Sequence, residues 1–81
     1  MRVDEVEWDE GNLYHATLRV SAAEIEQVIE DPASIWRLNR KGRTATHLVS
    51  GRTTGGTAVR VAVLYEPATR TVRPITAVRI G

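Results

Sequence analysis

Cysteine is absent from this 81-residue sequence, and histidine occurs only twice. The lack of cysteine excludes a disulfide framework and a thiolate metal site. Two histidines with no carboxylate at ligand spacing do not form a zinc site, so we expect neither a metal nor another cofactor. No long apolar run is present, and the N-terminus begins with charged residues instead of a signal-peptide pattern. We therefore expect a cytoplasmic protein that does not enter a membrane.

Aromatic residues are also scarce, and the sequence has only Trp8, Tyr14, Trp36 and Tyr65. The apolar core must therefore come mainly from valine, isoleucine, leucine and alanine. At this length we expect a single domain, residues 1–81, near the lower limit of what folds alone without disulfides or metal. A core of this size would gain stability from being covered by a partner, and a homodimer is one such arrangement.

The formal net charge of +1 conceals a strong separation of charge along the chain. Residues 1–31 contain nine acidic and two basic side chains, a net charge of −7, whereas residues 32–81 contain nine basic and one acidic, a net charge of +8. The densest basic stretch is WRLNRKGRTATH (36–47), which contains no acid. This asymmetry indicates a nucleic acid or another charged partner, with a solvated basic hairpin as the alternative of equal weight.

Two short helices are predicted in the acidic part of the chain. The first covers about residues 9–19, with a narrow apolar stripe formed by Leu13, Ala16 and Thr17. Ser21 followed by Glu24 is a capping box, so a second helix is expected to begin there. This helix, AAEIEQVIED, has one apolar face made of Ile25, Val28 and Ile29. Pro32 ends it.

Strands and turns are predicted for most of the remainder. The candidate strands cover residues 3–8, 33–38, 44–50, 57–65 and 71–80. Between them lie the turns NRKG, in which Gly42 can take positive φ, GRTTGG (51–56), which is expected to be a hairpin loop, and EPATR (66–70). The strand over 57–65 alternates, with Arg60 on one face and the other face formed by Val59, Val61, Val63 and Tyr65. The expected fold class is α+β, with two short N-terminal helices packed on an antiparallel sheet of about four strands. Arg60 and Arg73 would then share the face that the helices leave uncovered.

Two motifs in a fixed order span nearly the whole chain, from Val6 to Ala77. The first is VEWDEGNLYHATLRVSAAEIEQVIEDP, whose distinctive residues are Trp8, Asp9, Asn12 and His15. The second is GRTTGG followed by VRVAVLYEPATRTVRPITA, whose distinctive residues are Gly51, Arg52 and Thr53 in the turn and Arg73, Ile75, Thr76 and Ala77 in the last strand. Together they resemble the BrnT family of toxins, of which this chain looks like a divergent or truncated member.

This resemblance implies a RelE-like fold and a ribonuclease toxin of a type II toxin–antitoxin system. The implied activity is metal-independent endonucleolytic cleavage of RNA, which inhibits translation. The implied partners are RNA and a cognate antitoxin protein that neutralises the toxin. One departure concerns Val78, where many members have an arginine. Here Arg79 follows one place later, and in a strand that offset sends its side chain to the opposite face.

Metal-free RNA cleavage needs cations that stabilise the phosphorane charge and a group that moves protons. Arginine suits the first role because it stays protonated and pairs bidentately with phosphate, and histidine suits the second. The expected catalytic residues are therefore Arg52, Arg60, Arg73 and His47. Further RNA contacts are expected from Arg37, Arg40, Lys41, Arg43 and Arg79. His15 is the other candidate for proton transfer, but the preferred interpretation is that it helps to hold the first helix on the sheet, together with Trp8, Asp9 and Asn12.

Two other function classes remain open. The departure at Val78 and the scarcity of proton-transfer residues favour a catalytically inactive BrnT-like module that binds RNA or protein. The charge separation is also compatible with a protein-interaction domain that self-associates through its opposite charges.

Overall fold

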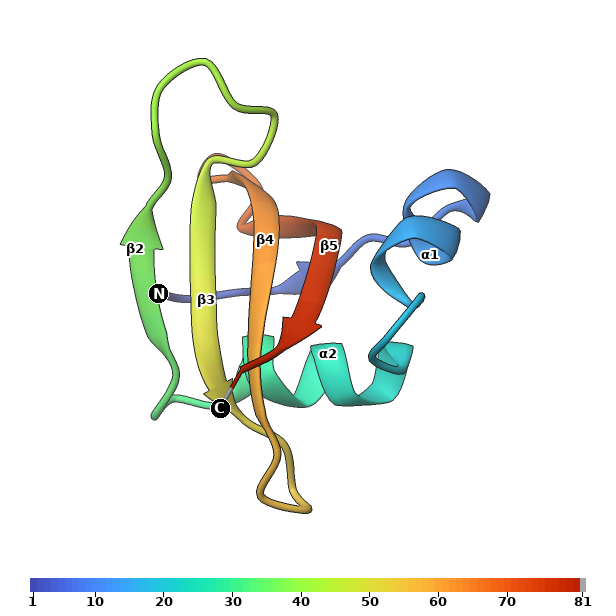
Figure 1. Ribbon diagram of the computed structural model, residues 1–81. Helices are drawn as coiled ribbons and strands as arrows, with labels where there is room; N and C mark the ends of the chain where they lie inside the picture. The colour runs from blue at the N-terminus through green and yellow to red at the C-terminus, as the bar shows by residue number, and fades with distance from the viewer. Residues whose placement is uncertain (81) are drawn as a thin grey trace.

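Two helices and five strands follow one another along residues 1–80, the part of the chain that the computed structural model describes (Figure 1). Their bounds are β1 (Glu5–Val6), α1 (Glu10–Ala16), α2 (Ala22–Glu30), β2 (Ile35–Leu38), β3 (His47–Arg52), β4 (Ala58–Glu66) and β5 (Thr71–Arg79). The strands form one sheet in the order β1-β5-β4-β3-β2. β2 to β5 are antiparallel neighbours, and β1 pairs with β5 in parallel.

The predicted α+β class is confirmed, but the sheet is not the four-stranded antiparallel one that the sequence suggested. It has five strands and is mixed, because the segment after the N-terminus adds a parallel edge strand. The backbone amides of Asp4 and Glu7 donate to the carbonyls of Arg70 and Val72 at 2.8 Å and 2.7 Å. This pairing joins the two ends of the chain, so local periodicity does not predict it.

Both helices begin with a capping box. At α2 the Ser21 side chain accepts from the Glu24 amide, and the Glu24 carboxylate accepts from the Ser21 amide, as predicted. At α1 Asp9 is the N-cap, and its side chain accepts from the Asn12 amide at 3.0 Å. The Asn12 side chain accepts in turn from the Asp9 amide at 2.7 Å. The turn chemistry thus fixes where each helix starts.

The core lies between α2 and one face of the sheet. Val59, Val61 and Val63 are fully buried, as the alternation in β4 predicted, and they meet the buried apolar residues of α2, which are Ile25, Val28 and Ile29. In Figure 1, α2 runs behind β3 and β4, and α1 lies beside β5. We call the sheet face that carries these valines the inner face.

No helix of residues 1–80 packs on the other face, which we call the open face. Strand register places on it the residues that alternate with the inner valines, and none of these is buried: Ile35, Arg37, Leu48, Ser50, Arg60, Ala62, Leu64 and Val78. An antiparallel sheet with one covered and one solvated face commonly shows this alternation. Neither α1 nor α2 is long and apolar enough to cross a membrane.

Two local predictions differ from the structure, one of them only in part. β3 begins at His47 and not at residue 44, because the Asn39 amide donates to the Thr46 carbonyl (2.8 Å) and closes the loop before the strand starts. The expected apolar stripe on α1 is only partly right, because Ala16 is buried but Leu13 is not. Leu13 is 42% exposed, whereas the polar Asn12 is buried because its amide group is fully hydrogen-bonded inside.

Candidate nucleic-acid interface

Three arginines project from the open face on β2, β3 and β4. Arg37 lies on β2 opposite Leu48, Arg52 ends β3, and Arg60 lies on β4 opposite Ser50. All three side chains are exposed. From the register, the Cα atoms of Arg37 and Arg60 are about 12 Å apart, since they are separated by two strand spacings and two residues along the strand.

A groove of about 450 Å³ lies between Arg37 and Arg60. Its other lining residues are Ile35, Leu48, Ser50 and Ile80. A second hollow of about 370 Å³ shares Ile35, Ser50 and Ile80 with it and extends toward Arg52 and Asp31. The open face is therefore concave, with an apolar floor and cations at its sides.

The loop between β2 and β3 extends this basic surface beyond the end of the sheet. Arg40, Lys41 and Arg43 are exposed in it. Gly42 has φ +84°, as the NRKG turn predicted, and the Asn39 side-chain amide donates to the Ala45 carbonyl at 2.9 Å. The loop therefore presents its three cations from a defined turn.

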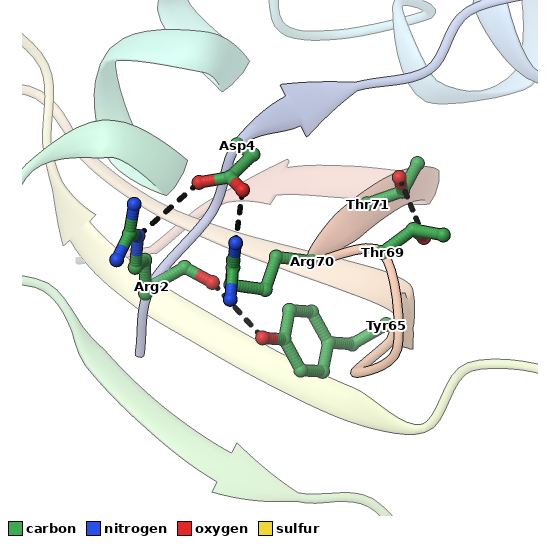
Figure 2. Close-up of polar contacts among 6 residues, drawn as sticks. All are labelled: Arg2, Asp4, Tyr65, Thr69, Arg70 and Thr71. Carbon is green, nitrogen blue, oxygen red and sulfur yellow. Dashed lines mark hydrogen bonds and ion pairs between the residues drawn. The ribbon is translucent and has the colours of Figure 1, made fainter.

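Ion pairs divide the arginines into two groups. Asp4 binds both Arg2 (3.3 Å) and Arg70 (2.8 Å), and the Tyr65 hydroxyl donates to the Arg2 carbonyl (2.9 Å), as Figure 2 shows. Arg73 pairs with Asp9 and, at 3.6 Å, with Glu7. The acidic N-terminal segment thus neutralises the basic residues at the β1–β5 edge of the sheet.

These ion pairs also shift the titration of the groups involved. The pKa of the Asp9 carboxyl is lowered, first by its hydrogen bond from Arg73 and then by the Asn12 amide. Arg70 lowers the pKa of Asp4 in the same way. The pKa of Arg73 is raised, mainly by its hydrogen bond to Asp9. In each of the two pairs, Asp4–Arg70 and Asp9–Arg73, each partner favours the charged form of the other.

The second group has no such partner. Among residues 1–80, no carboxylate lies within 4.0 Å of a charged nitrogen of Arg37, Arg52 and Arg60 or of the three loop cations. Arg52 does donate to the Gly56 carbonyl at 2.9 Å, but it remains exposed. We call this second group the cationic strip, and its members are Arg37, Arg40, Lys41, Arg43, Arg52 and Arg60.

The four residues expected to be catalytic do not meet at one place. Arg52 and Arg60 belong to the cationic strip. Arg73 faces the same side as Arg60 but lies at the β5 edge, where Asp9 and Glu7 hold it. His47 lies opposite the buried Val63 and therefore belongs to the inner face.

His47 is part of an aromatic cluster. Its ring packs edge-on against Trp36 and Tyr65, with ring centroids 6.0 Å and 5.7 Å apart, and its Nδ1 lies 2.9 Å from the Thr46 hydroxyl. Trp36 and Tyr65 in turn pack against the core. The sheet therefore separates this imidazole from a phosphate held at Arg60.

Arg79, which was expected to contact RNA, does not lie on the open face. It lies opposite the buried Val59, while Val78 lies opposite Arg60, so the predicted effect of the one-residue offset is confirmed. The Arg79 guanidinium donates to the Arg19 carbonyl at 2.6 Å. This arginine therefore joins the last strand to the connection between the helices.

Three residues of the N-terminal motif have structural roles. The Asn12 amide donates to the carbonyls of Glu7 (3.0 Å) and Pro74 (2.9 Å) and so fixes α1 to β5. The Trp8 indole donates to Glu26 of α2 at 2.7 Å, and Asp9 caps α1. His15 differs from the expectation, because it is exposed and shares a cavity of about 200 Å³ with Arg73.

The GRTTGG segment is a hairpin turn, as predicted. Thr53 is buried, its amide donates to the Thr57 carbonyl (2.9 Å), and its hydroxyl accepts from the Thr57 amide (3.1 Å). No three histidine or carboxylate side chains of residues 1–80 lie close enough together to hold a metal ion. Sequence reasoning missed the groove residues Ile35, Ser50 and Ile80, although their outward position follows from strand alternation.

Comparisons of the chain with protein-family models, with curated proteins and with solved structures gave no match. The resemblance to BrnT toxins therefore continues to depend on its motifs alone.

Proposed function

We propose that this protein is an RNA-binding module that holds the phosphate backbone on its cationic strip without cleaving it. The observation that carries the proposal is the division of the basic side chains. Those at the β1–β5 edge are paired with carboxylates, whereas the six of the cationic strip have none within 4.0 Å in the described chain. Three of the six lie on the open face, and the other three are exposed in the loop that follows β2. An unneutralised basic surface of this kind attracts polyanions.

The chemistry of the groove fits phosphate. A guanidinium donates two parallel hydrogen bonds to phosphate oxygens and stays charged at every physiological pH. Arg37 and Arg60 flank the groove and Ser50 adds a hydroxyl between them. Each phosphate that the strip neutralises releases condensed counterions, so the affinity should fall steeply as salt is added.

Binding is favoured over cleavage because proton-transfer groups are few on this surface. In the described chain no histidine lines the groove or the neighbouring hollow. The one carboxylate there is Asp31, whose side chain accepts from the Ala33 amide at 2.9 Å. Cleavage through the 2′-hydroxyl would leave the proton of that hydroxyl without a nearby acceptor at Arg37 and Arg60.

The test is RNA affinity of the double variant Arg37→Gln/Arg60→Gln, measured by fluorescence anisotropy over a range of salt concentrations. We expect about 10–100-fold weaker binding and a shallower salt dependence by about two phosphate contacts. Arg2→Gln/Arg70→Gln is the matched control, because it removes the same charge from arginines already paired with Asp4. Equal losses for both double variants would mean that only net charge matters, and the proposal would then fail.

A second candidate is the ribonuclease toxin that the family resemblance implies, with a RelE-like fold and a neutralising antitoxin. One observation favours it: His15 and Arg73 line the same cavity, and so provide one proton-transfer group and one phosphate-binding cation. Incubating RNA with the protein in EDTA tests this candidate. Cleavage products that disappear in both His15→Ala and Arg73→Gln would support the toxin, and intact RNA at high protein concentration would count against it.

A further inference from the structure

We infer that the cationic strip recognises double-stranded RNA through its backbone and does not read the sequence of single strands. This inference rests on the proposed RNA binding and specifies the form of RNA. It follows from what accompanies the cations on the open face and from how far apart they lie.

Base stacking is not available on the open face. Proteins that hold single-stranded nucleic acid combine a basic groove with aromatic side chains on which successive bases stack. In the described chain each of the four aromatic residues lies elsewhere: Trp8 is hydrogen-bonded to α2, Trp36 and Tyr65 belong to the inner face, and Tyr14 is on α1. A single strand bound at the strip would therefore leave its bases without a stacking partner.

The aromatic ring of Trp36, next to Arg37 in β2, already packs against other rings. Trp36 contacts the ring edges of both Tyr65 and His47, with centroid separations of 5.8 Å and 6.0 Å. These contacts and the packing against the core cover part of each ring, and the register places both Trp36 and Tyr65 on the inner face, opposite the strip. The floor of the groove is made of Leu48 and Ser50, which offer one hydroxyl for hydrogen bonding.

The spacing of the cations favours a dense and rigid array of phosphates. Arg37 on β2 lies opposite Leu48 on β3, and Arg52 follows Leu48 by four residues along β3. The Cα atoms of Arg37 and Arg52 are therefore about 14 Å apart. A DNA duplex presents roughly one charge per 1.7 Å of its axis, or about eight charges over that length, and an RNA duplex likewise presents its phosphates as a dense array. The loop cations continue the strip beyond Arg37.

A duplex thus gives fixed guanidinium groups more phosphates within reach, and it keeps its bases stacked internally. Duplex RNA is recognised mainly by shape and by contacts to phosphates and 2′-hydroxyls. The Ser50 hydroxyl, between Arg37 and Arg60, is placed to contact such a hydroxyl. Apart from Arg37, Arg60 and Ser50, whose contacts are expected to go to the backbone, no polar side chain of residues 1–80 lines the groove, so the strip should not distinguish between duplexes of different sequence.

The experiment compares the affinity of the full chain for three RNA probes of about 20 nucleotides or base pairs, a length chosen to exceed one module's footprint. Two are duplexes of unrelated sequence and the third is an unstructured polyuridine strand. We expect at least fivefold tighter binding to both duplexes than to the single strand, and less than a threefold difference between the duplexes. Arg60→Gln should weaken duplex binding severalfold, and Tyr14→Ala should not change it.

Each other outcome is decisive. Single-strand binding as tight as duplex binding, or a loss of affinity in Tyr14→Ala, would overturn the duplex inference and leave the RNA-binding proposal intact. A strong preference for one duplex sequence would also overturn it. Failure to bind any of the three probes, with circular dichroism showing a folded protein, would overturn both.

Discussion

Replacing Asn12 with alanine should destabilise the protein strongly. The side chain is only 5% exposed and makes three hydrogen bonds: to the carbonyls of Glu7 and Pro74, at 3.0 Å and 2.9 Å, and from the Asp9 amide, at 2.7 Å. Alanine removes all three bonds and leaves those backbone groups without their partners. At about 1 kcal/mol for each bond, we expect a loss of about 3 kcal/mol in the free energy of unfolding.

The assay is urea unfolding followed by circular dichroism, together with the melting temperature. In a domain of this size, a loss of about 3 kcal/mol lowers Tm by roughly 12–24 °C. His15→Ala is the matched control, because His15 belongs to the same helix and the same motif but is exposed, and we expect a change within about 0.5 kcal/mol. A loss under about 1 kcal/mol for Asn12→Ala, or an equal loss for His15→Ala, would refute the reasoning.

Two further predictions concern packing and charge. Gly51→Ala should cost about 1–3 kcal/mol in urea unfolding, because the added Cβ would lie 3.1 Å from Ser34 Cβ and closer still to its Oγ. Gly55→Ala, whose Cβ would find nothing nearer than 3.9 Å, should be neutral, and equal losses would contradict this packing argument. Because Arg73 lowers the folded-state pKa of Asp9 below its ordinary value of 3.8, the stabilisation from this pair is present above that pH and is lost as the pH falls through the folded-state pKa. Tm should therefore fall more steeply on acidification below about pH 4 in the wild type than in Asp9→Asn, and identical profiles would contradict this assignment.

The local elements of this fold follow from the sequence to a large extent. The capping box at Ser21, the apolar face of α2 and the alternation of β4 are all determined by residues close together in the chain, and all are confirmed. The turn at Gly42 follows for the same reason, because its positive φ suits a residue without Cβ. Such features are decided by sterics and hydrogen bonding within a few residues.

Features that depend on pairing between distant segments of the chain could not be predicted from the sequence. The sequence predicts a strand within residues 3–8, but it does not predict that β1 joins the sheet as a parallel edge strand beside β5. A register shift opposite Ala62 and Val63 likewise appears only once β4 and β5 are paired. Neither the parallel pairing nor the register shift has a signal in its own segment.

The candidate site shows the same limit. Charge and alternation placed Arg60 on the solvent face, whereas the pairing of His47 with the buried Val63 places it on the inner face, away from Arg60. The ion pairs between the N-terminal acids and Arg70 or Arg73 join opposite ends of the chain, so composition did not reveal them. The burial of Asn12 runs against the usual preference of a polar residue and follows only from the carbonyls that surround it.

The most direct test of the central claim is an NMR titration that observes the arginine Nε–Hε signals while duplex RNA is added. The unpaired guanidinium groups of Arg37 and Arg60 should shift or broaden at the lowest RNA concentrations. Those of Arg70 and Arg73, held by Asp4 and Asp9, should stay in place until binding is saturated. If Arg70 and Arg73 respond first while Arg37 and Arg60 do not respond, the open face is not the RNA-binding surface and the account is contradicted.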